Sequence, residues 1–230
     1  MDLVYLYVKL EVSMKPLLYA HPFAAYCQKV LVAIYENDTP FTYRKLEDAS
    51  AMSELEALWP MKKFPVLVDE GQVFLESSII IEHLVNRHPG PVRLISSDPQ
   101  IALEARTMDR VFDNYVMTPM QTIVADFIRD KNDRDPLSVK GAKSMLDSAY
   151  GWLNGVLEKR TWAAGETFSL ADCAAAPSLF FADWVHEIDA RLPNLRAYRE
   201  RLLARASVAR AVDEARPYRK LFPPGAPDRD

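Results

Sequence analysis

The chain has few cysteines and no long apolar run, and each absence excludes a class of protein. Cys27 and Cys173 are the only cysteines among 230 residues, which is too few for a disulfide framework and fits a reducing compartment. No apolar run approaches the roughly 20 residues that a membrane-spanning helix needs. With 49% hydrophobic and 26% charged residues, the composition is that of an ordinary globular protein. We therefore expect a soluble protein of the cytoplasm.

Excess charge of one sign and metal-ligand spacing are also lacking. The formal net charge is −4, so there is no basic field of the kind that nucleic acid requires. The histidines are His21, His83, His88 and His186. His83 and His88 are five residues apart and should diverge around a helix, so we expect no metal site.

The chain is long enough for two modest domains. Residues 1–14 include an apolar stretch but lack the basic start and small-residue cleavage site of a signal peptide, and we interpret them as an N-terminal extension. A Pro- and Gly-rich break and a polar segment after the first helical run predict the remaining boundaries. We expect a first domain at 15–90, a linker at 91–98, a second domain at 99–222 and a flexible tail at 223–230.

The first domain is predicted to alternate strands and helices. Periodicity indicates strands at 15–20, 41–46, 66–68 and 73–75 and helices at 25–36, 52–58 and 77–87. Two βα units that lead into an antiparallel hairpin form a mixed four-stranded sheet with helices on both faces. This is a thioredoxin-like order.

The hairpin region is predicted to bind a small peptide. Pro65 begins its first strand, where a missing N–H costs no ladder bond, and residues 69–71 are typical of a turn. Ser77 is well suited to cap the helix that follows. A helix start binds anions, because its first N–H groups have no partner within the helix.

The second half is predicted to be an all-α bundle. Amphipathic stretches cover 100–130, 136–159, 169–187, 193–205 and 206–215, and none of them shows strand-like alternation. Ser169 and Asp172 have the spacing of a capping box, with Asp in place of the usual Glu or Gln. The tail is rich in proline and charge and is expected to stay unstructured.

Three short motifs in this order resemble the soluble glutathione transferase superfamily, bacterial type: Phe64-Pro-Val-Leu67, Glu76-Ser77 and Ser169-Leu-Ala-Asp172. The segment 21–30 also looks like the first-helix signature of bacterial members. The resemblance covers residues 15 to about 215. It implies a thioredoxin-like domain followed by a helical bundle, glutathione as co-substrate, no metal, and a homodimer.

The resemblance also assigns residues to glutathione. Pro65 would follow a cis peptide bond, so that the backbone of Val66 pairs with the cysteinyl part of the tripeptide as an added strand. Glu76 would hold the ammonium group and Ser77 the carboxylate of the γ-glutamyl end, while Lys63 could meet the glycyl carboxylate. The expected glutathione-binding residues are Lys63, Phe64, Pro65, Val66, Glu76 and Ser77.

The sequence departs from the family where the thiol must be ionised. A free thiol has a pKa of about 8.5, and lowering it by about two units takes roughly 2.7 kcal/mol, close to one hydrogen bond to an anion. Many relatives place a serine or cysteine at this position, but here it is Ala24. Three substitutes remain open: the phenol of Tyr19, the imidazole of His21, or the backbone N–H groups of Ala25 and Tyr26 at the helix start, which we favour.

A second substrate is expected between the domains. Phe23 is one candidate contact, and Met108, Phe112 and Tyr115 have the i, i+4, i+7 spacing of one helix face. This predicts an apolar pocket for a small hydrophobic electrophile, and hence a glutathione transferase; a peroxidase or an isomerase would use the same activated thiol. The alternative, favoured by Ala24, is a non-catalytic adaptor or scaffold of the same fold.

Overall fold

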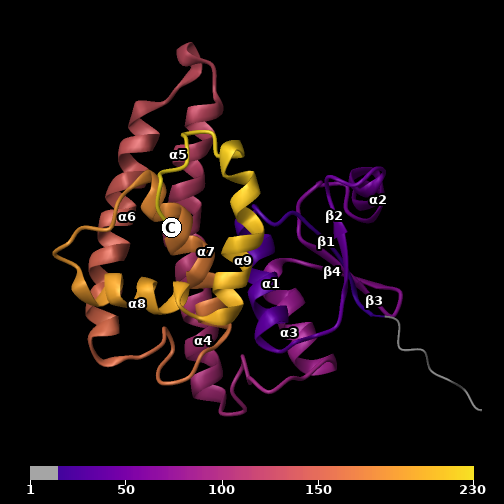
Figure 1. The fold of residues 1–230 in the computed structure, drawn as a ribbon. Coiled ribbons are helices and arrows are strands. Elements are labelled where there is room, and N and C mark those ends of the chain that lie inside the picture. The colour runs from indigo at the N-terminus through magenta and orange to yellow at the C-terminus, as the bar shows by residue number, and fades with distance from the viewer. Residues whose placement is uncertain (1–14) are drawn as a thin grey trace, which may run out of the picture.

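The computed structural model describes residues 15–230, and the first domain has the predicted order β-α-β-α-β-β-α (Figure 1). The extension expected over residues 1–14 lies outside the described residues. The elements are β1 (Leu17–Ala20), α1 (Ala25–Glu36), β2 (Thr42–Lys45), α2 (Ala51–Leu58), β3 (Val66–Asp69), β4 (Gln72–Leu75) and α3 (Ser77–Arg87).

The sheet is mixed, as predicted, with strand order β2-β1-β3-β4. β1 pairs with β2 in parallel through the α1 crossover, whereas the β1–β3 and β3–β4 pairs are antiparallel. Because side chains alternate along a strand, Leu18 and Leu67 lie in the core with α1 and α3, and Tyr19 and Val66 meet Leu55 of α2 on the opposite face. The sheet is therefore covered on both faces.

The β3–β4 hairpin has a two-residue loop. Asp69 was expected to lie in the turn. It instead pairs with Gln72 and is the last residue of β3. Glu70 and Gly71 have φ values of 49° and 78°. Positive φ at both central positions is the mark of a type I′ turn, whose twist suits a hairpin.

The second domain is helical throughout. Its elements are α4 (Pro99–Val111), the π-helix η1 (Phe112–Met117), α5 (Thr118–Ile128), the short 3-10 helix η2 (Lys131–Asp133), α6 (Pro136–Val156), the 3-10 helix η3 (Leu157–Lys159), α7 (Leu170–Val185), α8 (Pro193–Leu203), α9 (Ala206–Ala215) and the 3-10 helix η4 (Arg216–Leu221). The capping box at Ser169 and Asp172 is confirmed: the Asp172 carboxylate accepts from the Ser169 backbone N–H at 2.8 Å.

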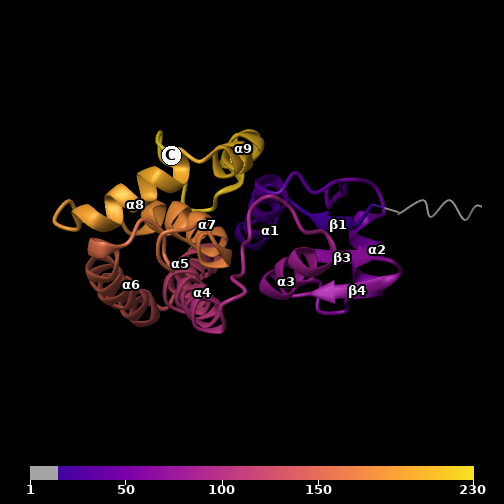
Figure 2. The ribbon, with the colours of Figure 1, turned by 90° about the horizontal axis from the view of Figure 1, so that it is seen from below.

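Helix α1 joins the two domains. It packs against α3 on the sheet side and against α7 and α9 on the bundle side (Figures 1 and 2). Every residue from Cys27 to Tyr35 is buried as a result. A helix with apolar contacts all round belongs in an interior, and α1 lies inside a core that runs without a break from the sheet to the bundle.

The C-terminal tail, expected to be flexible, is instead held by ion pairs. Asp230 pairs with Arg216 and Arg219, and Arg229 pairs with Asp183 of α7. Asp183 is only 5% exposed, and a buried carboxylate needs such partners. Within residues 15–230, no helix has both the length and the apolar character that crossing a bilayer requires.

Candidate active site

One pocket of about 630 Å³ opens between the two domains. This volume lies within the roughly 300 to 1,000 Å³ of typical small-molecule sites. We call it the interdomain pocket. Its walls come from the start of α1, the loop before β3, the start of α3, and α4, η1 and α5: Ala24, Ala25, Tyr26, Trp59, Lys62, Lys63, Phe64, Pro65, Glu76, Ser77, Arg110, Asp113, Asn114 and Gln121.

One wall contains the peptide-binding residues predicted from the sequence. Lys63, Phe64, Pro65, Glu76 and Ser77 all line the pocket, and the Phe64–Pro65 bond is cis. Within residues 15–230, the side chains of Lys63, Glu76 and Ser77 make no hydrogen bond or ion pair. The pocket therefore presents a cation, an anion and a hydroxyl that are available to a ligand.

Val66 differs from its neighbours. Its side chain is fully buried against α2 and does not line the interdomain pocket. Val66 pairs with Leu75 on one side and with Tyr19 on the other. Because strands flank Val66 on both sides, it has no free sheet edge, and the expected pairing of a ligand strand at Val66 is wrong.

The backbone at Glu76 is unusual. Glu76 has φ 67° and ψ 122°, a region that costs a residue with a side chain about 1 to 3 kcal/mol and that clusters at functional sites. Ser77 was expected to cap α3, but it is the first residue of the helix, and Glu76 occupies the cap position without a side-chain cap bond. The start of α3 therefore opens into the pocket with its N–H groups uncapped by a side chain.

The start of α1 is open in the same way. Ala24 occupies its cap position, makes no side-chain cap bond, and is followed by a first turn with no acidic residue. In contrast, Asp98, Asp135 and Ser169 cap α4, α6 and α7 with their side chains. The first N–H groups of α1, which point along the helix axis, are therefore available to an anion in the pocket.

Tyr19, one candidate donor for the thiol, does not lie at the pocket. It is 6% exposed, and its hydroxyl donates to Glu54 at 3.2 Å. Burial, followed by the Glu54 contact, raises the pKa of this phenol. The reason for the error is strand alternation: Leu18 and Ala20 face α1, so Tyr19 faces α2.

His21 is also turned away. Its ring lies edge-on to Tyr218 with centroids 4.8 Å apart, and its Nδ1 accepts from the Phe23 N–H at 3.1 Å. Burial lowers its pKa, which favours the neutral form.

Among the described residues, Ala25 and Tyr26 are thus the only predicted catalytic positions that line the pocket. Burial, then Asp113, raises the pKa of the Tyr26 phenol to about 12.

The opposite wall rests on a buried ion network that spans the domains. Lys29 of α1 is 1% exposed, and its Nζ lies 2.5 Å from Asp109 and 2.8 Å from Asp113. Ser78 accepts from Lys29 and donates to Asp109, each at 2.9 Å, and Arg110 pairs with both carboxylates. The charges of Lys29 and Arg110 balance those of Asp109 and Asp113. Burial nevertheless raises the pKa of Asp113, and the nearby charge of Lys29 partly offsets this rise.

The π-helix brings the end of this network to the pocket. Pro119 has no N–H, and its ring crowds the carbonyl four residues earlier, a common cause of a widened or kinked turn. The Thr118 N–H bonds to Asp113 O, a π-type i to i+5 step. Asp113 and Asn114 therefore line the pocket. The sequence analysis did not identify Asp113, Asn114, Arg110 or Gln121 as site residues. The signal available in the sequence was the presence of acidic residues among apolar ones.

The predicted apolar stripe does not line the pocket. Met108 and Phe112 are 1% and 0% exposed in the core, whereas Tyr115 is 49% exposed. The π-helix that begins at Phe112 breaks the i, i+4, i+7 relation, so Tyr115 does not share the face of Met108 and Phe112. None of the three lines the interdomain pocket.

Phe23 does line an apolar surface beside the pocket. A groove of about 360 Å³, here called the apolar groove, shares Ala25, Lys63 and Gln121 with the interdomain pocket. Its other lining residues are Phe23, Met120, Val124, Ala125, Ile128, Phe181 and Phe222. A polar pocket and an apolar groove therefore meet at the start of α1.

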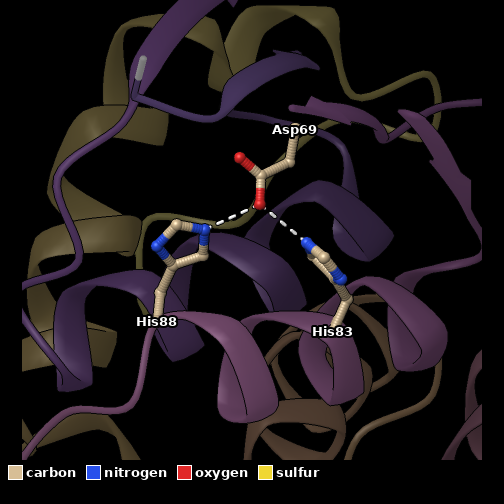
Figure 3. Close-up of side chains that lie close together, drawn as sticks. All are labelled: Asp69, His83 and His88. Carbon is tan, nitrogen blue, oxygen red and sulfur yellow. Dashed lines mark hydrogen bonds and ion pairs between the residues drawn. The ribbon is translucent and has the colours of Figure 1, made fainter. Parts of the chain in front are cut away.

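A second polar cluster lies at the other end of β3 and α3 (Figure 3). His83 and His88 were expected to diverge around one helix, but the Nε2 atoms of both lie 2.7 Å from the same Asp69 oxygen. The expectation failed because α3 ends at Arg87 and His88 is its C-cap, with φ −128° and ψ 55°. The chain leaves the helix there, so helical spacing no longer applies.

Comparison with known proteins identifies the family of both domains. Models described as the glutathione S-transferase N-terminal and C-terminal domains match residues 18–92 and 126–201. The chain is 27% identical to FtsZ-localized protein A of Caulobacter vibrioides over 192 residues, 76% of this chain and 81% of that one. It is 26% identical to glutathione S-transferase U25 of Arabidopsis thaliana, over 84% and 86% of the two chains.

A solved structure supports the same fold. A glutathione S-transferase of Methylobacterium radiotolerans in complex with glutathione sulfonate superposes with a TM-score of 0.75 and 26% identity. The match covers 86% of this chain and 95% of that one.

Replacing Lys29 with Met should destabilise the protein strongly. The change leaves two buried carboxylates without their shared cation, and breaking a buried ion pair costs about 3 to 5 kcal/mol. The free energy of unfolding is measured by urea denaturation followed by tryptophan fluorescence. Lys62→Met removes the exposed pair with Glu56 and should change stability by less than about 0.5 kcal/mol. Equal effects of the two variants would contradict a structural role for the network.

Proposed function

Because this chain belongs to the soluble glutathione transferase superfamily, we propose that it is a cytoplasmic transferase that binds glutathione in the interdomain pocket and transfers its thiol to a small hydrophobic electrophile. One observation carries the proposal. Unpartnered side chains of Lys63, Glu76 and Ser77 meet the open start of α1 in a single pocket. The buried, unpaired cysteines fit a reducing compartment.

The charges of the pocket match those of glutathione, which has two carboxylates and one ammonium group. Lys63 binds the glycyl carboxylate, and the Ser77 hydroxyl with the start of α3 binds the γ-glutamyl carboxylate. Glu76 accepts from the ammonium group. Asp113 supports this contact, because its Oδ1 is buried and has no hydrogen-bond partner within residues 15–230. The backbone of Phe64, which precedes the cis bond and lines the pocket, pairs with the cysteinyl unit.

The thiolate is stabilised by the backbone at the start of α1. Ala24 offers no hydroxyl, and Tyr19 and His21 lie away from the pocket. What remains is the positive end of α1 with the N–H groups of Ala25 and Tyr26. Tyr26 itself stays protonated, because its pKa is raised to about 12, so its phenol is no base at neutral pH.

The electrophile occupies the apolar groove. Phe23, Phe181 and Phe222 provide aromatic contacts there, and Met120 adds an adaptable side chain. The groove meets the interdomain pocket at Ala25. This position brings an apolar second substrate to the place where the thiol of bound glutathione would lie.

A specific observation also favours a second function, a non-catalytic adaptor. Ala24 removes the side-chain donor used in many relatives, and one relative is named for its localisation with FtsZ. An adaptor of this kind keeps the fold and acts through contacts with other proteins. The two functions differ in whether the pocket activates a thiol.

Ser77→Ala should weaken glutathione binding at least tenfold. The variant loses a hydrogen bond to a carboxylate, worth about 1.5 to 3 kcal/mol, and about 1.4 kcal/mol corresponds to a factor of ten. Isothermal titration with glutathione measures the dissociation constant. Ser148→Ala on α6, whose hydroxyl donates to Ser144 O, is the matched control and should bind as the unchanged protein does. Equal affinity in all three proteins would exclude this binding mode.

The bound thiol should have a pKa clearly below the roughly 8.5 of a free thiol. Ultraviolet absorbance of the thiolate, recorded against pH with bound glutathione, measures it. Tyr19→Phe should leave this value unchanged, whereas Ala24→Ser should lower it further and raise conjugation with a chromogenic aryl halide, because serine adds a donor. A thiol with an unshifted pKa would favour the adaptor. A loss of activation in Tyr19→Phe would overturn the backbone mechanism.

We further propose a homodimer formed through α3 and α4. Large apolar side chains are exposed on β4, α3 and α4, namely Val73, Ile79, Ile101 and Leu103, and such surfaces mark contact sites. Sedimentation equilibrium should give twice the chain mass for the unchanged protein and a shift toward one chain mass for Leu103→Glu. Leu137→Glu, at an exposed position of α6, is the control and should stay dimeric. A monomeric unchanged protein would refute the dimer.

A further inference from the structure

Three donor atoms converge where β3 and α3 end, away from the interdomain pocket. Asp69 is the last residue of β3, His83 lies in the last half of α3, and His88 is its C-cap. The Asp69 oxygen and the two imidazole Nε2 atoms all lie within 4.8 Å of one another (Figure 3). The pocket side of these elements is formed by Pro65 and Ser77, at their opposite ends.

The charge at this cluster is not balanced by a permanent cation. The Asp69 side chain is only 1% exposed, and its partners among residues 15–230 are the imidazoles of His83 and His88. Its second oxygen is buried and has no hydrogen-bond partner among residues 15–230. The nearby Arg87 donates to Glu70 instead. A buried carboxylate with an unpartnered oxygen is stabilised by a bound cation.

We propose that Asp69, His83 and His88 bind a divalent transition-metal ion of the zinc type. Two imidazole nitrogens and one carboxylate oxygen form a three-ligand set that zinc uses, with a fourth position left to water. The donor set excludes Mg²⁺ and Ca²⁺ as preferred ions, because these take oxygen ligands.

Ion binding requires the three side chains to adjust. Bonds of about 2.0 to 2.1 Å in a tetrahedral arrangement place ligand atoms roughly 3.3 Å apart. The two nitrogens lie 2.7 Å from the Asp69 oxygen and within 4.8 Å of each other, so each must move away from that oxygen by about 0.6 Å while the nitrogens settle at roughly 3.3 Å from each other. His88 can supply most of this movement, because it follows the last helical residue of α3.

The surroundings suit a bound ion. The His83 ring stacks on Phe74 of β4 with centroids 3.6 Å apart, which orients its nitrogen toward Asp69. The side chains of His83 and His88 are 14% and 21% exposed, so an ion has an entry path and a place for water. Binding would tie the end of α3 to β3 and stabilise the first domain.

The test uses the tag-free, full-length protein after metal removal and in the absence of glutathione. Zn²⁺ is titrated against a chromogenic competing chelator, and Co²⁺ is added separately to record its visible absorption. We expect one Zn²⁺ per chain, the intense absorption bands of tetrahedral Co²⁺, and a melting temperature that rises with Zn²⁺. Cys27 and Cys173 are fully buried and should not compete.

His88→Gln and His83→Gln should each weaken Zn²⁺ binding at least tenfold and abolish the melting shift. His186→Gln is the matched control, because His186 pairs with Asp147 at the same 2.7 Å distance elsewhere on the chain; it should bind Zn²⁺ unchanged. Circular dichroism establishes that each variant is folded. No stoichiometric Zn²⁺ in the unchanged protein, or unchanged binding in a folded His88→Gln, would overturn the proposal.

Discussion

The buried ammonium group of Lys29 is the contact on which the arrangement of the two domains depends. It lies on α1 of the first domain and meets two carboxylates of the second, Asp109 and Asp113. All three side chains are almost fully buried, so each charge needs the others. Because Asp113 also lines the interdomain pocket, the contact that holds the domains together shapes the site between them.

The pocket is built from two helix starts and one irregular helix. α1 and α3 both begin at its wall without a side-chain cap, whereas α4, α6 and α7 have caps of Asp or Ser. The open starts can hold anions. The π-turn around Asp113 brings polar groups to the facing wall. An anionic tripeptide fits this combination better than a wholly apolar ligand, which the neighbouring groove suits.

Ala24 leaves the start of α1 without a side-chain donor. A helix start can stabilise a thiolate without a side chain, but the effect is weaker and less directed than a hydroxyl in place. Such a pocket lies close to the boundary between a modest catalyst and a glutathione-binding adaptor. The metal site proposed at the far end of β3 does not depend on whether the pocket is catalytic, because Asp69, His83 and His88 do not line the pocket.

The sequence by itself determined the local structure: the element order, the hairpin, and the capping box at Ser169. Periodicity, turns and caps act over a few residues, so they can be read along the chain. Only the tertiary structure decided which face Tyr19 occupies, that Phe112 enters the core, and that His83 and His88 meet Asp69. Those outcomes depend on contacts between distant segments and on where a helix stops or widens, which no local spacing encodes.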